Sequence, residues 1–227
     1  MSLAVVTGGS RGIGRATAFA LAARGFSLAL PARPSAARTE TEEELRRRGV
    51  KHRFFDCDLT EGAELTRTAE LILAECGAPD VLVNNAGIIE RASVAECTDA
   101  SWERQLALNL TAPFRLTRSF LPAMLERRRG RILHVASISA VLGTARQAAY
   151  HASKWGLLGF MKCLAEELSD TGLMTCAILP GSVETDMLAG SGFPARMTPD
   201  EVARTLCFYA TEAPLAHNGA IVEMFGT

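Results

Sequence analysis

The stretch from Leu3 to Arg24, LAVVTGGSRGIGRATAFALAAR, decides the fold of this chain. It reads as a short apolar strand, a glycine-rich turn and a helix with apolar residues at helical spacing. Glycine allows a ligand to approach the backbone closely, and a helix N-terminus offers unpaired N–H groups to an anion. A glycine motif on its own is a weak signal, and a tight structural turn is the alternative interpretation. Its place between a strand and a helix favours a cradle for nucleotide phosphates, made of Gly8, Ser10, Arg11, Gly12, Ile13 and Gly14.

Strand-like and helix-like segments alternate along the rest of the chain, which predicts a parallel sheet covered on both faces. We expect an α/β protein, a single-domain doubly wound Rossmann fold over residues 1–227 with about seven parallel strands. The expected strands lie at 2–7, 27–32, 51–56, 80–84, 131–136, 174–179 and 220–224, and the expected helices at 12–24, 39–49, 61–76, 99–127, 147–171 and 198–210. Because proline cannot donate to a sheet, we expect the second strand to stop at Pro31.

The composition is that of an ordinary globular protein, with 48% hydrophobic residues and a formal net charge of −1. No basic excess indicates nucleic acid, no apolar run is long enough to span a membrane, and the first residues lack a signal-peptide pattern. We therefore expect a cytoplasmic protein with no nucleic-acid or membrane partner. The 6 cysteines show no C-x-x-C spacing and the 4 histidines no ligand spacing, so we expect reduced, packed thiols and no metal site.

A candidate reacting centre lies in the second half of the chain. Lys154 follows Tyr150 by four residues, so the two share one face of a helix, and Ser137 lies upstream of them. A free phenol keeps its proton up to a pH of about 10. A neighbouring ammonium favours the phenolate, which would make Tyr150 an acid and base for interconverting carbonyls and alcohols. Taken alone, such a pair is also a common structural feature of helix surfaces.

Six motifs, in this order, make the chain resemble the short-chain dehydrogenase/reductase family over essentially its whole length. They are TGGSRGIG at residues 7–14, Asn84-Asn85-Ala86-Gly87, Asn109, Ser137, Tyr150 with Lys154, and Pro180-Gly181 with Thr185.

This resemblance implies four catalytic residues: Asn109, Ser137, Tyr150 and Lys154. Tyr150 would be the general acid in reduction and the general base in oxidation, and Ser137 would polarise the substrate carbonyl. Lys154 would lower the pKa of Tyr150 and bind the nicotinamide ribose. Asn109 would kink its helix so that a main-chain carbonyl holds a proton-relaying water. Ser139 is the rival to Ser137, and the spacing to Tyr150 favours Ser137.

The end of the second strand distinguishes NAD from NADP. Ala32 and Arg33 stand where a carboxylate would bind the ribose 2′-OH, and Arg11 adds a second guanidinium from the glycine loop. Because arginine suits a phosphate, we expect NADP(H); the alternative is that both are solvated surface arginines.

By resemblance, further cofactor contacts come from the loops that follow the third, fourth and sixth strands. They are Asp58 and Leu59; Asn85, Ala86 and Gly87; and Pro180, Gly181, Val183 and Thr185, in addition to Tyr150 and Lys154. Asp58 could instead be the N-cap of the helix near residue 61, and Pro180-Gly181 could be an ordinary turn.

Among family members the chain looks most like 3-oxoacyl-[acyl carrier protein] reductases, through the segment RILHVAS at residues 131–137. This implies an NADPH-dependent reductase of a 3-oxoacyl thioester. The alternatives are an NADP-dependent alcohol, sugar or steroid dehydrogenase and a non-catalytic NADP(H)-sensing protein. Arg127, Arg128 and Arg129 resemble a patch that docks the acyl carrier protein, or they simply suit the C-terminus of a helix.

Two further expectations concern the surface. The segment from Asp186 to Met197 is too short for the usual pair of lid helices, which predicts an open substrate pocket. The family resemblance also implies a homodimer or homotetramer, formed through the outer faces of the helices at 99–127 and 147–171, which carry Phe114, Leu121, Trp155 and Phe160.

Overall fold

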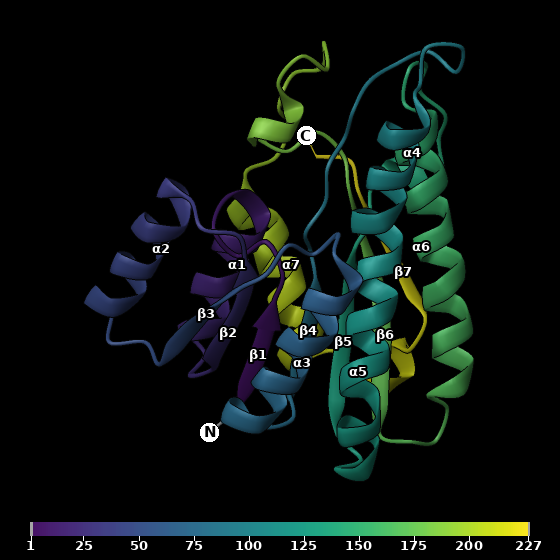
Figure 1. Ribbon diagram of the computed structural model, residues 1–227. Helices are drawn as coiled ribbons and strands as arrows, with labels where there is room; N and C mark the ends of the chain where they lie inside the picture. Colours follow the sequence, from purple (N-terminus) through teal and green to yellow (C-terminus); the bar gives the residue numbers. More distant parts are fainter. Residues whose placement is uncertain (1, 227) are drawn as a thin grey trace.

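In the computed structural model, which describes residues 2–226, seven parallel strands form one sheet in the order β3-β2-β1-β4-β5-β6-β7. The strands are β1 (Leu3–Val6), β2 (Ser27–Ala32), β3 (His52–Asp56), β4 (Val81–Asn84), β5 (Gly130–Val135), β6 (Leu173–Pro180) and β7 (Ala220–Met224). Figure 1 labels these strands. They coincide with the predicted strands, and each boundary agrees to within one residue. The predicted doubly wound α/β fold is therefore confirmed.

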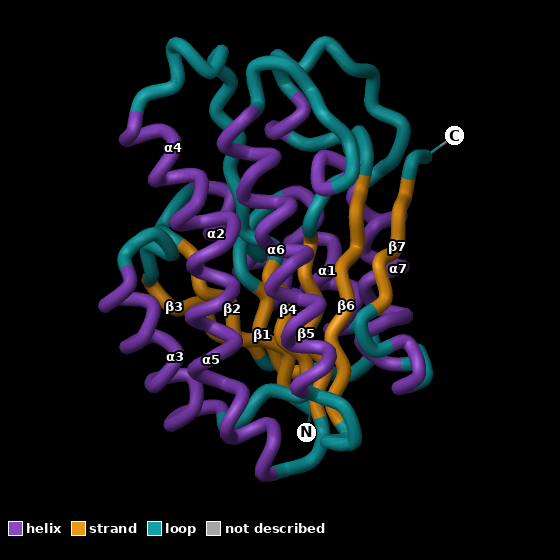
Figure 2. Tube along the Cα trace, turned by 90° about the vertical axis from the view of Figure 1, so that its right-hand side faces the viewer, coloured by secondary structure: helices purple, strands orange, loops and turns teal. Residues whose placement is uncertain are grey.

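Helices cover both faces of the sheet (Figure 2). The main helices are α1 (Gly12–Ala22), α2 (Ala36–Arg47), α3 (Gly62–Cys76), α4 (Asp99–Leu106), α5 (Ala112–Glu126), α6 (Ala148–Glu167) and α7 (Pro199–Thr211). One apolar core fills the space between the sheet and α1 with α7, and a second lies between the sheet and α3, α5 and α6. Because both faces of the sheet are covered, strands such as β4 and β6 are buried along their whole length and mostly apolar, rather than alternating.

The strand order reverses between β1 and β4, which are direct neighbours although β2 and β3 separate them in sequence. In open α/β sheets, ligands bind outside the carboxyl ends of the strands at such a switch point. The segments that follow Val6 and Asn84 therefore meet at the edge of the sheet where a ligand is expected.

β2 ends at Ala32, as the predicted range 27–32 has it, but the expectation that the proline at position 31 stops the strand is wrong. Pro31 pairs in register with Phe55 of β3, whereas the pairing of β2 with β1 ends at Ala29. Beyond Ala29 the strand has a neighbour on one side only, and proline is tolerated on such an edge.

The predicted helix over 99–127 is interrupted. Between α4 and α5 the chain forms a π-helix over Ala107–Thr111, with Asn109 at its centre. The segment 186–197 contains one short 3₁₀ turn, Asp186–Leu188, and no α-helix, as its length predicted. Among residues 2–226, no helix combines the length and the apolar character that crossing a membrane requires.

Candidate active site

The glycine turn after β1 has the geometry of an anion cradle. Gly8 and Gly12 have φ of +64° and +52°, conformations that other residues rarely adopt. A Cβ on Gly14 would lie 2.2 Å from the carbonyl oxygen of Gly8, so the turn closes directly onto α1. The N-terminus of α1 has no side-chain cap, which leaves its first N–H groups available to a phosphate.

The loop after β4 braces this turn. The side-chain amide of Asn85 donates to the carbonyl of Thr7 at 2.8 Å, and the Thr7 hydroxyl accepts from the main-chain N–H groups of Asn85 at 2.9 Å and Ala86 at 3.0 Å. Gly8 would contact the Cα of Ala86 at 3.1 Å if it carried a Cβ. The side chain of Asn85, a predicted cofactor residue, thus holds the glycine turn through Thr7. The backbone of Ala86, next to Gly87, lies beside Gly8 of that turn.

The loop after β6 reaches the same place. A Cβ on Gly12 would lie 3.1 Å from the Cγ2 of Thr185, so the predicted nicotinamide loop and the phosphate turn are in contact. Gly181 donates its N–H to the carbonyl of Met224 at 2.8 Å, and Val183 pairs with Met197. Residues predicted from three distant parts of the chain therefore converge on one edge of the sheet.

The two arginines predicted to select NADP are exposed, and each is paired with a carboxylate. Arg11 lies 2.8 Å from Asp186, and Arg33 lies 3.5 Å from Asp58. The alternative interpretation of Asp58 as the N-cap of α3 is wrong, because α3 begins after Glu61. Asp58 instead accepts from the N–H and hydroxyl of Thr60, and the hydroxyl hydrogen bond lowers the pKa of Asp58.

Asn109 holds the π-helix in place. Its amide exchanges two hydrogen bonds with the main chain of Ile88, each of 2.9 Å, and also donates to the Ser153 hydroxyl at 3.0 Å. These bonds tie the loop after β4 and helix α6 to the interruption between α4 and α5. The predicted helix disturbance at Asn109 is confirmed, and π-helical turns of this kind occur often at functional sites.

Tyr150 and Lys154 lie on α6 and are almost fully buried, with 6% and 3% of their surfaces exposed. The Lys154 Nζ atom donates to the carbonyl of Val135 at 2.9 Å and lies 5.6 Å from the Tyr150 ring centroid. A Cβ on Gly87 would lie 3.2 Å from the Asn109 Oδ1 and 3.7 Å from the Lys154 Nζ. The reacting centre therefore adjoins the cradle at the carboxyl ends of β4 and β5.

The pKa of Tyr150 is shifted upward in this structure, whereas its pairing with Lys154 predicted a shift downward. Burial raises the pKa of Tyr150, while a hydrogen bond with Ser137 and the charge of Arg91 oppose that rise. Burial also lowers the pKa of Lys154 itself, to about 8, and its amine is directed at a main-chain carbonyl. The influence of the Ser137 hydroxyl on the pKa of Tyr150 favours Ser137 over Ser139, whose N–H donates to the Ser137 hydroxyl at 3.1 Å.

Arg91, on the loop between β4 and α4, is a site residue that the sequence reasoning missed. Its only signal in the sequence is a position a few residues beyond the fourth strand, where ligands of such sheets bind. His151 also borders the centre: its ring lies edge-on to Tyr150, with centroids 6.3 Å apart, and its Nδ1 lies 2.7 Å from the carbonyl oxygen of Leu142.

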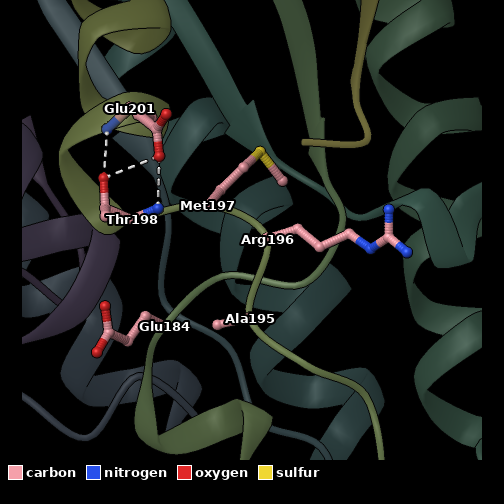
Figure 3. Close-up of a pocket in the computed structure, with 6 residues that line it drawn as sticks. All are labelled: Glu184, Ala195, Arg196, Met197, Thr198 and Glu201. Carbon is pink, nitrogen blue, oxygen red and sulfur yellow. Dashed lines mark hydrogen bonds between the residues drawn. The ribbon is translucent and has the colours of Figure 1, made fainter. Parts of the chain in front are cut away.

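A surface hollow of about 160 Å³ lies beside the loop after β6. It is lined by Glu184, Ala195, Arg196, Met197, Thr198 and Glu201 (Figure 3). Thr198 and Glu201 form a capping box at the start of α7, in which the Glu201 carboxylate accepts from the Thr198 N–H at 2.7 Å. Neither Tyr150 nor Lys154 lines this hollow, so we do not assign it to the reaction.

The arginines predicted to dock a carrier protein lie at the amino end of β5, the opposite edge of the sheet from Tyr150. Arg127 and Arg129 both bind the Asp80 carboxylate, at 2.7 and 2.9 Å, and Asp80 accepts from the Leu3 N–H at 2.8 Å. Two of the three arginines therefore stabilise the fold.

The chain also resembles known proteins. A family model described as short chain dehydrogenase matches residues 2–192. The chain belongs to this family. It is 38% identical over 185 residues to the 3-oxoacyl-[acyl-carrier-protein] reductase FabG of Escherichia coli, an alignment covering 82% of this chain and 75% of that protein. It is 32% identical to the D-beta-hydroxybutyrate dehydrogenase of Cupriavidus necator, over 98% of this chain and 96% of that one.

A solved structure has the same fold. It is described as a "putative NAD(P) dependent gluconate 5-dehydrogenase" from Beutenbergia cavernae, with NADP bound at low occupancy. It matches with a TM-score of 0.91 and 33% identity, covering 98% of this chain and 94% of that one. The family resemblance found in the motifs, including the likeness to 3-oxoacyl reductases, is confirmed, and the chain is an oxidoreductase of the short-chain dehydrogenase family.

Proposed function

We propose that the protein is an NADPH-dependent carbonyl reductase whose substrate is a 3-oxoacyl thioester. The observation that carries this proposal is the convergence of Asn109, Ser137, Tyr150 and Lys154 beside the glycine cradle. The likeness to a 3-oxoacyl-[acyl-carrier-protein] reductase supports the substrate class.

The cradle fits a dinucleotide phosphate. A Cβ at Gly14 would occupy the turn, the α1 N-terminus has no side-chain cap, and Arg11 and Arg33 flank the place expected for the adenosine ribose. Arginine can donate two parallel hydrogen bonds to a 2′-phosphate, and each of these arginines is exposed enough to exchange its carboxylate partner. The NADP bound to the gluconate 5-dehydrogenase structure supports the same cofactor.

In the proposed reaction, NADPH supplies a hydride to the ketone carbon and Tyr150 supplies the proton to its oxygen. Because burial raises the pKa of Tyr150, the phenol keeps its proton at neutral pH, which suits a proton donor in reduction. Ser137 orients the substrate carbonyl, and its hydroxyl, which lowers the pKa of Tyr150, favours the phenolate left after transfer. Lys154, with a pKa of about 8, keeps a protonated amine 5.6 Å from the centre of the Tyr150 ring.

The likeness to a hydroxybutyrate dehydrogenase and a gluconate 5-dehydrogenase favours a second candidate, an NADP-dependent alcohol or sugar dehydrogenase working in the oxidative direction. A non-catalytic NADP(H) sensor would need the cradle but not the buried tyrosine and lysine.

We also propose a cytoplasmic homodimer or homotetramer, with a second copy covering the exposed faces of Phe114 and Trp155, which are 41% and 55% exposed.

The test is NADPH oxidation against acetoacetyl thioesters, diketones, quinones, aldehydes and keto-sugars. We expect the thioesters to be reduced fastest, and Tyr150→Phe to abolish turnover while NADPH binding stays nearly intact. Rapid reduction of keto-sugars without reduction of thioesters would show that the substrate is a sugar and not a thioester. Undiminished activity of Tyr150→Phe would show that Tyr150 is not the proton donor.

A further inference from the structure

Arg91 bridges two loops above the reacting centre. It lies on the loop after β4, and its guanidinium donates to the carbonyl of Met187 at 3.1 Å and to that of Ala189 at 3.3 Å. Both carbonyls belong to the short segment that replaces the lid helices, beginning with the 3₁₀ turn Asp186–Leu188. One side chain thus ties the lid segment to the loop that carries Gly87.

The charge of Arg91 is not balanced by the protein. Among residues 2–226, no carboxylate pairs with it: the adjacent Glu90 pairs with Arg104 at 3.0 Å, and Asp186 of the lid pairs with Arg11. The Nε–H of Arg91 is buried and has no hydrogen-bond partner. Leaving a buried polar group and a half-buried cation without partners costs stability, so their presence calls for a functional reason.

Arg91 also lies close enough to Tyr150 for its charge to affect that residue. Its charge acts on Tyr150, favouring the ionised phenol. The Met187 side chain, on the segment that Arg91 holds, reaches within 3.9 Å of a Cβ built on Gly87, next to Asn109 and Lys154. Arg91 and the lid segment therefore lie beside the proposed reacting residues.

We propose that Arg91 binds the second carbonyl oxygen of the substrate, the thioester oxygen that lies one methylene away from the ketone. This inference rests on the proposed function and specifies how its substrate is recognised. When the lid segment moves aside to admit the substrate, the fork of Arg91 exchanges the carbonyls of Met187 and Ala189 for an acceptor on the ligand. Tyr150 and Ser137 take the ketone oxygen and Arg91 takes the other, which fixes the ketone for hydride transfer.

The probes are acetoacetyl-CoA and S-(3-oxobutyl)-CoA, a thioether with the same ketone and a methylene in place of the thioester carbonyl. Arg91→Met should lower kcat/KM for acetoacetyl-CoA by about 10- to 100-fold, the typical loss for a charged hydrogen bond, and change the thioether by less than about 3-fold. Arg91→Lys, which keeps the charge but not the fork, should give an intermediate loss. Arg67→Met, at an exposed arginine on α3, is the matched control and should affect neither probe. Equal losses for both probes with Arg91→Met would mean that Arg91 only holds the lid, and no loss would also overturn the proposal.

A binding measurement separates this inference from the proposed function. In the Tyr150→Phe background, calorimetry with NADPH present should show acetoacetyl-CoA binding at least about 10-fold more tightly than the thioether, and Arg91→Met should remove that difference. If the wild-type protein reduces neither probe, the reductase proposal fails, yet this difference still supports Arg91 as the acceptor site. Equal binding of the two probes, or no binding of acetoacetyl-CoA, overturns the role of Arg91.

Discussion

Replacing Lys154 by methionine should stabilise the folded protein at neutral pH, although it removes a residue of the proposed reacting centre. Lys154 is 3% exposed and its pKa is lowered from 10.5 to about 8 by burial. Below pH 8 the folded protein must therefore hold a buried ammonium that the unfolded chain solvates freely. At about 1.36 kcal/mol per pKa unit, this costs the folded state about 3 kcal/mol.

The sign of the pH dependence follows from the two pKa values. Between pH 8 and 10.5 the unfolded chain holds more protons than the folded protein, so the free energy of unfolding of the wild type rises with pH in this window. The penalty falls from about 3 kcal/mol near pH 6.5 to about 1 kcal/mol near pH 9.5. Methionine has a similar shape but loses the hydrogen bond to Val135, worth about 1 kcal/mol. Lys154→Met should thus be about 2 kcal/mol more stable than the wild type near pH 6.5 and about equal to it near pH 9.5.

Urea unfolding of the two proteins at both pH values measures this difference. The matched control is Lys162→Met, because Lys162 lies on the same helix, also donates to a main-chain carbonyl, that of Gly219 at 2.8 Å, and is exposed. It should give a small difference that does not change between the two pH values. The reasoning is refuted if Lys154→Met is less stable than the wild type near pH 6.5, or if its advantage does not shrink as the pH rises.

Three further outcomes are expected. Gly14→Ala should destabilise the fold by about 1–3 kcal/mol in thermal unfolding and weaken NADPH binding, because its Cβ would lie 2.2 Å from the Gly8 carbonyl oxygen; unchanged binding would contradict the cradle. Arg33→Ala and Arg11→Ala should each raise KM for NADPH at least about 10-fold more than KM for NADH in steady-state kinetics, and equal effects would remove both arginines from 2′-phosphate recognition. Trp155→Glu should shift the protein to monomers in sedimentation experiments, because Trp155 is 55% exposed on the proposed interface; an unchanged sedimentation coefficient would contradict that interface.

The fold was predictable because local signals and the sheet pattern agree. A strand, a glycine turn and a helix at residues 3–24 set the first unit, and apolar strands with helices between them follow along the chain. The continuation of β2 through Pro31 was not predictable, because it depends on where the neighbouring strand β1 stops pairing. The N-cap of α3 depends in the same way on how the chain turns after Asp58.

The sequence predicted which side chains the fold brings together, but it did not predict their electrostatics. Helical spacing brings Tyr150 and Lys154 close together, but it does not report how deeply they are buried, and burial determines the direction of both pKa shifts. Arg91 escaped prediction because its importance comes from contacts with Met187 and Ala189, almost a hundred residues further along the chain. Only the folded arrangement shows that its charge has no carboxylate partner among residues 2–226.

The π-helical turn over Ala107–Thr111 makes this part of the chain sensitive to deletions. Removing one of these five residues would allow α4 to continue into α5 in α-helical register, apart from the hydrogen bond that Pro113 cannot donate. Every side chain on one side of the cut would then rotate by about 100° relative to the other side. Asn109 could then no longer face both Ile88 and Ser153. The shortened chain would lose the hydrogen bonds of Asn109 to these residues and form a straighter helix. Insertions and deletions at this point are therefore poor choices in any library built on this scaffold, even where single substitutions are tolerated.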